Sequence, residues 1–98
     1  MFIHAVLLEI KPKQVRAYRR DSAMWARYAA RVKGFISCYT LKRDNARNQF
    51  MSVYLWKTKA GHLEFMKKYH NWLAQRSRTK AKVLGEYYNF TVMDQFKR

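Results

Sequence analysis

Four short hydrophobic runs along the chain have the length and composition of β-strands. They cover residues 2–10, 35–42, 49–57 and 86–93. Each run is rich in β-branched and aromatic side chains, which favour an extended backbone. Residues 43–48 form a polar turn between the second and third runs, so we expect these two strands to pair as a hairpin.

Two longer segments repeat their hydrophobic residues every three or four positions, which is the spacing of an amphipathic helix. The first extends from Pro12, a residue favoured in the first turn of a helix, to about Val32. Gly34 follows where a C-terminal cap is expected. The second segment covers residues 59–78, and the basic residues of 76–82 connect it to the last strand.

This order of segments, βαββαβ, predicts one ferredoxin-like α+β domain over residues 1–98. In this fold an antiparallel four-stranded sheet carries both helices on one face and leaves the other face open. The first strand is hydrophobic on both sides, and one side of the third strand carries Met51, Val53 and Leu55. A hydrophobic sheet face of this size marks an interface, so we expect two copies to form a homodimer through it.

The charge of the chain indicates which partners it attracts. Its 21 Lys and Arg residues outnumber its 6 Asp and Glu residues, which gives a net charge of +15 at pH 7. A protein of this charge concentrates anions near its surface, whether they are small molecules or nucleic acids. We therefore expect an anionic ligand.

Nucleic-acid binding is one hypothesis that follows from the charge. Arg19, Arg20 and the basic residues of 76–82 can contact phosphates without sequence preference. Residues 33–39 imitate the start of the RNA-recognition-motif signature, but they lack its later aromatic residue and lie on the second strand instead of the third. We therefore rank nucleic-acid binding below the binding of a small anionic molecule.

Several kinds of site leave no signature in the sequence. Cys38 is the single cysteine, which excludes an internal disulfide and a multi-thiolate zinc site and suits a reducing compartment. There is no glycine-rich phosphate loop, paired-carboxylate site, nucleophile elbow or metal-ligand spacing. No hydrophobic run reaches the roughly 18 residues that cross a bilayer, and residues 1–4 lack the basic start of a signal peptide. We expect a cytoplasmic protein without a metal site or a membrane partner.

Three short motifs allow a comparison with known families. They are Val32-Lys33-Gly34-Phe35, Val53-Tyr54-Leu55-Trp56, and Gly61-His62-Leu63-Glu64-Phe65-Met66 followed by His70. Together they resemble the antibiotic-biosynthesis-monooxygenase-like family, in which a histidine follows the tryptophan at the same spacing as His70 follows Trp56. The resemblance covers nearly the whole chain and implies a dimeric α+β barrel. It also implies a monooxygenase that oxidises a small aromatic or polycyclic anionic substrate without a cofactor.

The family also contains haem-degrading enzymes, which carry an Asn on the first strand and a Trp and a His on the second helix. Aligned on Gly34 and Trp56, these three roles fall on Leu7, Phe65 and Gln75. None of the three residues matches, so the resemblance disfavours haem degradation. Haem binding is kept as an alternative, in which the protein holds haem or another planar anion with little or no catalysis.

Two histidines of the second helix are the candidate catalytic residues, His70 first because of its spacing from Trp56 and His62 second. They lie eight residues apart, about two helical turns, so both can face the sheet. Either imidazole can accept a proton from a phenolic or enolic substrate, which lets the resulting carbanion react with oxygen. His4, on the first strand, is interpreted as a packing or interface residue.

Aromatic side chains from both helices and from the third strand are expected to line a substrate pocket between the helices and the sheet. They are Trp25, Tyr28, Trp56, Phe65, Tyr69 and Trp72. Aromatic residues at this spacing are also typical of a hydrophobic core, which is the simpler interpretation of Trp56 and Trp72.

Overall fold

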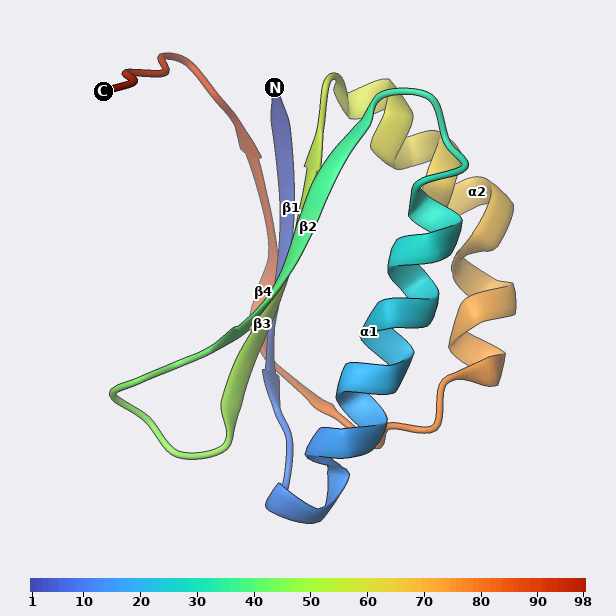
Figure 1. The fold of residues 1–98 in the computed structure, drawn as a ribbon, viewed down its shortest axis with the longest axis vertical. Coiled ribbons are helices and arrows are strands. Elements are labelled where there is room, and N and C mark those ends of the chain that lie inside the picture. The colour runs from blue at the N-terminus through green and yellow to red at the C-terminus, as the bar shows by residue number, and fades with distance from the viewer.

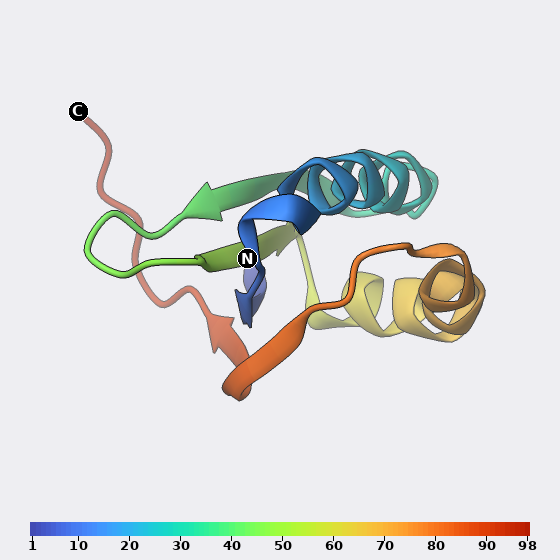
Figure 2. The same ribbon diagram turned by 90° about the horizontal axis from the view of Figure 1, so that it is seen from below.

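The computed structural model describes residues 1–98, and its elements follow the predicted order. The strands are β1 (Phe2–Glu9), β2 (Phe35–Lys42), β3 (Gln49–Trp56) and β4 (Lys82–Thr91). A 3-10 turn at Pro12–Gln14 leads into helix α1 (Val15–Ala29), and helix α2 covers Lys59–Arg76. Both helices pack on one side of the sheet (Figure 1), and they lie next to each other in one layer (Figure 2). The predicted α+β class and βαββαβ order are confirmed.

The largest boundary error concerns β4, which begins at Lys82 instead of residue 86. The pairing of β1 with β4 shifts register between Val6 and Leu8, because β4 bulges there. Gly85 lies in this bulge with a φ of 71°, in the left-handed region that glycine adopts without strain. The glycine therefore interrupts the sequence pattern of a strand that continues through it.

The four strands are antiparallel neighbours in the order β2-β3-β1-β4. In this register His4 lies between Tyr54 of β3 and Asn89 of β4. Side chains alternate between the two faces of a strand, so Val6 and Leu8 share the face of His4, which is turned toward the helices. The polar residues His4 and Asn89 are thus brought side by side on the helix-covered face.

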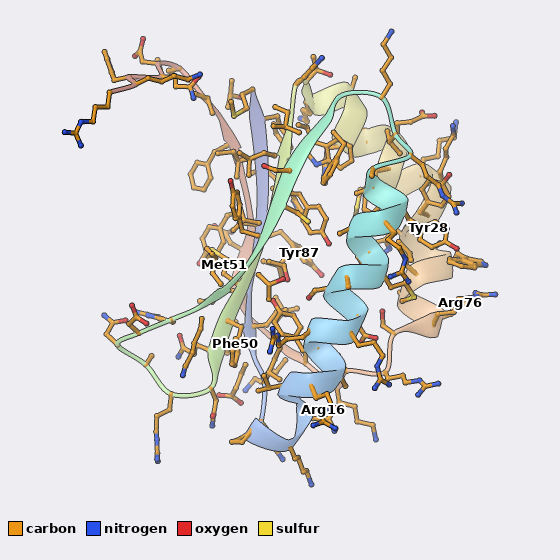
Figure 3. The ribbon with its side chains drawn as sticks, in the orientation of Figure 1. Arg16, Tyr28, Phe50, Met51, Arg76 and Tyr87 are labelled. Atoms are coloured by element: carbon orange, nitrogen blue, oxygen red, sulfur yellow. The ribbon has the colours of Figure 1, made fainter.

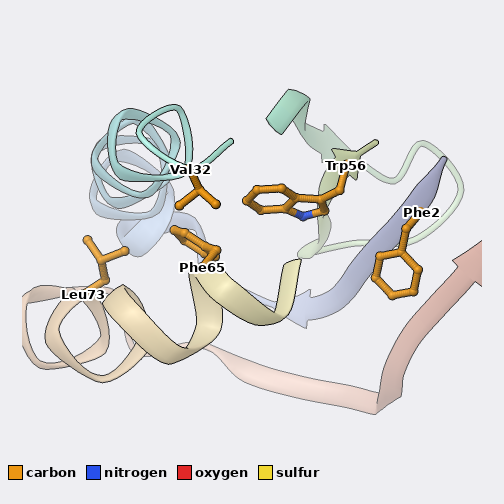
Figure 4. Close-up of a cluster of buried hydrophobic side chains, with 6 residues drawn as sticks. Phe2, Val32, Trp56, Phe65 and Leu73 are labelled. Atoms are coloured by element: carbon orange, nitrogen blue, oxygen red, sulfur yellow. The ribbon is translucent and has the colours of Figure 1, made fainter. Parts of the chain in front are cut away.

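The hydrophobic core lies between the sheet and the two helices. Its buried members are Phe2, Ala29, Val32, Trp56, Phe65 and Leu73 (Figure 4). Trp56 is fully buried, and the first turn of α2 packs tightly against its indole. A Cβ on Gly61 would lie 3.2 Å from both Trp56 Cε3 and the carbonyl oxygen of Lys33. Gly61 therefore allows α2 to begin close to the end of β3.

The opposite face of the sheet has no cover and is hydrophobic. Met51 lies on this side and Tyr87 on the helix-facing side, as Figure 3 shows. Tyr39 and Phe90, on the same face as Met51, are 53% and 57% exposed. Residues 92–98 extend away from the helices (Figure 1) and carry Phe96, which is almost fully exposed. Neither helix is both long enough and apolar enough to cross a membrane.

Candidate functional site

A cavity of about 500 Å³ lies between the helix-facing side of the sheet and the two helices. Its walls come from β1, β3, β4, α1, α2 and residues 77–81, which connect α2 to β4. This volume falls within the range of small-molecule sites. The cavity therefore has the size and position of a ligand site, and its walls combine aromatic side chains with a few polar groups.

Three histidines line the cavity, and two of them are stacked. The rings of His4 and His62 have centroids 4.4 Å apart and planes inclined by 30°. His62 belongs to the first turns of α2 and is buried, with Phe2 on one side at 5.3 Å and Trp56 at 6.4 Å between ring centroids. His62 thus lies in an aromatic environment, with its imidazole against that of His4.

His4 is held in place by β4. Its Nδ1 lies 2.7 Å from Oδ1 of Asn89, the residue paired with it across the two strands. With Oδ1 of Asn89 turned toward it, Nδ1 is the donor, because a carboxamide oxygen only accepts hydrogen bonds, and in this arrangement Nε2 is the basic nitrogen. Tyr87 stacks on the ring of His4, with centroids 5.9 Å apart. Asn89 and Tyr87 therefore hold the orientation of the His4 ring.

The surroundings keep the stacked imidazoles neutral near pH 7. Burial lowers the pKa of His62, and together with the neighbouring His4 and Lys59, which act in the same direction, it brings this pKa to about 4. Burial also lowers the pKa of His4, although the hydrogen bond to Asn89 opposes this shift. A neutral imidazole can accept a proton from a bound ligand.

His70, the first candidate from the sequence, also lines the cavity but is less enclosed than His62. Its ring meets Trp25 edge-on, with centroids 5.6 Å apart, and its Nδ1 lies 3.3 Å from Oδ1 of the exposed Asn71. Trp56 and Phe65 line the cavity as well. The indole N–H of Trp56, one of the residues that line the cavity, is buried without a hydrogen-bond partner, so it is an unused donor.

Another part of the cavity wall is polar and carries no histidine. The hydroxyls of Tyr18 and Ser52 lie 2.7 Å apart, and burial raises the pKa of Tyr18. The buried carboxylate of Asp21 accepts hydrogen bonds from the backbone N–H groups of Arg78 and Thr79, at 2.9 and 2.8 Å, and from the Thr79 hydroxyl. Because Asp21 is occupied in this way, it fastens the connector and is not a free base. No three His, Cys, Asp or Glu side chains are placed to hold a metal ion.

Three of the predicted pocket residues do not line the cavity. Tyr28, Tyr69 and Trp72 instead form a cluster between α1 and α2, in which the Tyr28 ring lies 5.3 Å from Tyr69 and 4.8 Å from Trp72. The guanidinium groups of Arg31 and Arg76 cover the rings of Tyr28 and Trp72 at 4.3 and 3.8 Å. The hydrophobic face of α2 is wide enough to contact both the sheet and α1, and Tyr69 and Trp72 lie on the part that faces α1.

His4 and Asn89 are two of the cavity residues that were missed or interpreted differently from the sequence. His4 was interpreted as a packing or interface residue, and Asn89 was not considered. The alternation of β1 already put His4 on one face with Val6 and Leu8. It gave no indication that this face meets α2 rather than a second copy of the chain.

Comparisons with known proteins bear on the fold. No family model matches the sequence, and no curated protein matches it. Among solved structures, a variant of SnoaB, a cofactor-independent oxygenase from Streptomyces nogalater, is 14% identical with a TM-score of 0.77, over 99% of this chain and 97% of that one. A proposed antibiotic biosynthesis monooxygenase from Deinococcus radiodurans is 8% identical with a TM-score of 0.78, over 100% of this chain and 98% of that one.

A third solved structure binds a porphyrin. A variant of MhuD, solved with two manganese protoporphyrin IX molecules per active site, is 12% identical with a TM-score of 0.79, and the match covers 100% of both chains. At these identities the comparisons show the fold. The ferredoxin-like fold of the single chain, which the sequence motifs implied, is confirmed.

Proposed function

We propose that this chain, which has the fold of the antibiotic-biosynthesis-monooxygenase-like proteins, is a small homodimeric monooxygenase. Its substrate would be a small aromatic or polycyclic anion, oxidised without a bound cofactor. One observation carries the proposal: neutral imidazoles line an aromatic cavity of about 500 Å³. A base that is neutral at physiological pH and enclosed with the substrate is the group that such a reaction requires.

Substrate binding rests on the cavity walls. Trp25 is only partly buried and offers a flat hydrophobic surface against which a planar ring system can stack, and the buried rings of Trp56 and Phe65 pack behind the cavity wall. The unpaired N–H of Trp56 would donate a hydrogen bond to a substrate oxygen that reaches it. The net charge of +15 draws anions toward the protein before they enter.

The chemistry begins with a proton transfer to His70 or His62. The O–H or acidic C–H bond of the substrate breaks, and the imidazole becomes an imidazolium beside the new substrate anion. Although burial disfavours a charged imidazole at His62, the adjacent anion offsets that cost by forming an ion pair. The electron-rich carbanion then reacts with dioxygen to form a C–O bond, and the resulting peroxide anion takes the proton back from the imidazolium. The hydroperoxide formed in this way loses water as its C–H and O–O bonds break, which leaves a carbonyl group.

Dimerisation is the second part of the proposal. The uncovered sheet face carries exposed aromatic residues, among them Tyr39 and Phe90. Met93 and Phe96 belong to the C-terminal segment that follows β4, and they are 89% and 93% exposed. A second copy that covers this face would bury all four side chains, and it would leave the cavity accessible because the cavity lies on the other side of the sheet.

A second candidate function is the binding of haem or another planar anion without turnover. Two observations favour it, namely the position of His70 on the cavity wall and the porphyrins bound by MhuD, which has the same fold. The imidazole of His70 would hold the iron. A titration with haemin would then produce a Soret shift that survives 0.5 M salt and is lost in His70→Ala, whereas binding that salt abolishes would indicate surface charge alone.

The test of the oxygenase is oxygen uptake with a planar phenolic probe, dihydroxyanthrone, in the presence of a chelator and without added flavin. We expect uptake well above the rate without protein. The double variant His62→Ala, His70→Ala should lower kcat by about 100-fold or more, because general-base catalysis contributes factors of this size. Circular dichroism would confirm that the variant is folded. Full activity of the double variant would overturn the assignment of the proton acceptors.

A further inference from the structure

His4 and Asn89 form a pair that joins the two ends of the chain at the cavity. They are 85 residues apart in sequence, yet they occupy directly opposite positions on β1 and β4. Both side chains line the cavity, and the hydrogen bond between them measures 2.7 Å. The pair is therefore a product of strand register, and it stands where a ligand would lie.

Among the three cavity histidines, His4 has the most constrained ring. Asn89 is hydrogen-bonded to it, while His62 and Tyr87 stack on it at centroid distances of 4.4 and 5.9 Å. His62 makes no side-chain hydrogen bond, and the bond from His70 to its neighbour Asn71 is longer, at 3.3 Å. A base whose ring and tautomer are held in advance loses less free energy on reaching the geometry of proton transfer.

The stacked pair of His4 and His62 is suited to hold a single proton. Two imidazolium ions with centroids 4.4 Å apart would repel each other strongly. The charged or titratable groups that face the pair from α2 are Lys59 and His70, and both oppose protonation. From β4, Tyr87 and Asn89 face the pair of histidines. No free carboxylate lines the cavity, because the carboxylate of Asp21 is hydrogen-bonded to the connector between α2 and β4.

We propose that His4 is a further catalytic residue, with Nε2 as the atom that accepts the second proton of the reaction, the one that leaves carbon when the hydroperoxide loses water, and that Asn89 is the positioning residue that holds it. The inference rests on the proposed oxygenase function and adds a base to its site. The C–H bond of the hydroperoxide breaks and an N–H bond forms at Nε2, while the carbonyl group forms, the O–O bond breaks and hydroxide leaves. The proton on Nε2 then passes to this hydroxide to form water, so the pair begins and ends each turnover without charge.

The first test needs no substrate. Long-range ¹H–¹⁵N correlation spectra of the imidazoles report which nitrogen carries the proton, and we expect the Nδ1–H form for His4. In Asn89→Leu the signal should move toward the mixture of tautomers found in free imidazole. A His4 that carries its proton on Nε2 in the wild type, or an unchanged spectrum in Asn89→Leu, would overturn the role of Asn89.

The second test uses oxygen uptake with dihydroxyanthrone. His4→Gln should lower kcat by about 100-fold with little change in KM, because it removes a general base and keeps a polar side chain. Asn89→Ala should lower kcat less, by about tenfold, and again leave KM almost unchanged. Thr91→Ala is the matched control, since Thr91 lies two residues farther along β4, is exposed and does not line the cavity. We expect it to match the wild type.

A third variant separates positioning from mere structural support. Asn89→Asp places a carboxylate against Nδ1 and should raise the pKa of His4, so the acid limb of the kcat profile should move to higher pH. A shift in the opposite direction or none would contradict the proposal. Full activity of His4→Gln alongside a loss in the His62, His70 double variant would overturn this inference and leave the oxygenase standing. No turnover by the wild type would overturn both.

Discussion

The carboxylate of Asp21 in α1 accepts three hydrogen bonds, from the backbone N–H groups of Arg78 and Thr79 and from the Thr79 hydroxyl. Arg78 and Thr79 lie 57 and 58 residues farther along the chain. This contact holds the connector between α2 and β4 over one side of the cavity. Trp25 adds a second attachment, because its indole N–H donates to the hydroxyl of Ser77 at 2.8 Å. The wall that the connector supplies therefore depends on two side chains of α1.

Removing the Asp21 carboxylate should destabilise the protein. Asp21→Ala leaves the N–H groups of Arg78 and Thr79 without an acceptor, so we expect the free energy of unfolding to fall by about 2 to 4 kcal/mol. Urea denaturation at one fixed protein concentration measures this loss. Asp44→Ala is the control, because Asp44 is exposed in the turn between β2 and β3. A change of less than about 0.5 kcal/mol in both variants would mean that Asp21 does not anchor the connector.

Gly61→Ala should reverse the usual effect of this substitution. In an exposed helix position the change from glycine to alanine stabilises by about 0.5 to 1 kcal/mol. Here the new Cβ would press on the backbone oxygen of Lys33 and on the Trp56 indole at 3.2 Å, and we expect a loss of about 1 to 3 kcal/mol in urea denaturation. Ala60→Gly, at the exposed neighbouring position, should cost only the propensity difference of about 0.5 to 1 kcal/mol. A more stable Gly61→Ala variant would show that α2 does not approach β3 this closely.

The low pKa of His62 should be visible in its titration and in the stability of the protein. The ring protons of His62 should titrate by NMR with a midpoint near 4, compared with an ordinary value of 6.5. In the interval between these two values the unfolded chain binds more protons than the folded one. The free energy of unfolding should therefore decrease as the pH falls from 6.5 to 4.

The variant His62→Phe tests the origin of this loss. Phe keeps a flat ring beside Phe2 and Trp56 but cannot bind a proton, so its stability should decrease less than that of the wild type between pH 7 and pH 5. The remaining pH dependence would come from His4, whose pKa is also lowered by burial. A wild-type midpoint above about 6 would show that His62 is not desolvated as described.

Strand alternation and helical spacing were sufficient to predict the fold, because a βαββαβ order with two hydrophobic strand faces fits few arrangements. They were not sufficient to divide the aromatic residues of α2. Phe65 meets the sheet, whereas Tyr69 and Trp72 meet Tyr28 of α1, and the same three-to-four-residue spacing serves both contacts. Which part of a wide hydrophobic face meets which neighbour depends on how the helices pack.

The pair of His4 and Asn89 could not be predicted for a different reason. Its formation requires the exact register of β1 against β4, and this register changes at the bulge around Gly85. The sequence of β4 reads as a strand only after that glycine. His4 could be assigned to a face from the alternation of β1 alone, but its partner follows only from the paired strands.

The proposed dimer predicts a specific effect of charge on the open sheet face. Val53 lies near the middle of this face, between Ala5 and Tyr39 on the neighbouring strands. Val53→Lys would bury a charge in the interface, so sedimentation equilibrium should show a dimer for the wild type and a monomer for the variant. Thr40→Lys adds the same charge at an exposed position of β2 that points to the other side of the sheet, and it should remain dimeric. A monomeric wild type at micromolar concentration would contradict the dimer.

The central claim is that the imidazole-lined cavity supports insertion of one oxygen atom from dioxygen, and isotope labelling tests it most directly. The purified protein would be incubated with dihydroxyanthrone and ¹⁸O₂ in the presence of a chelator, and the product would be analysed by mass spectrometry. We expect a quinone that carries one ¹⁸O atom, while the second atom of dioxygen leaves as water. A product without ¹⁸O, or one formed at the same rate without the protein, would contradict the account.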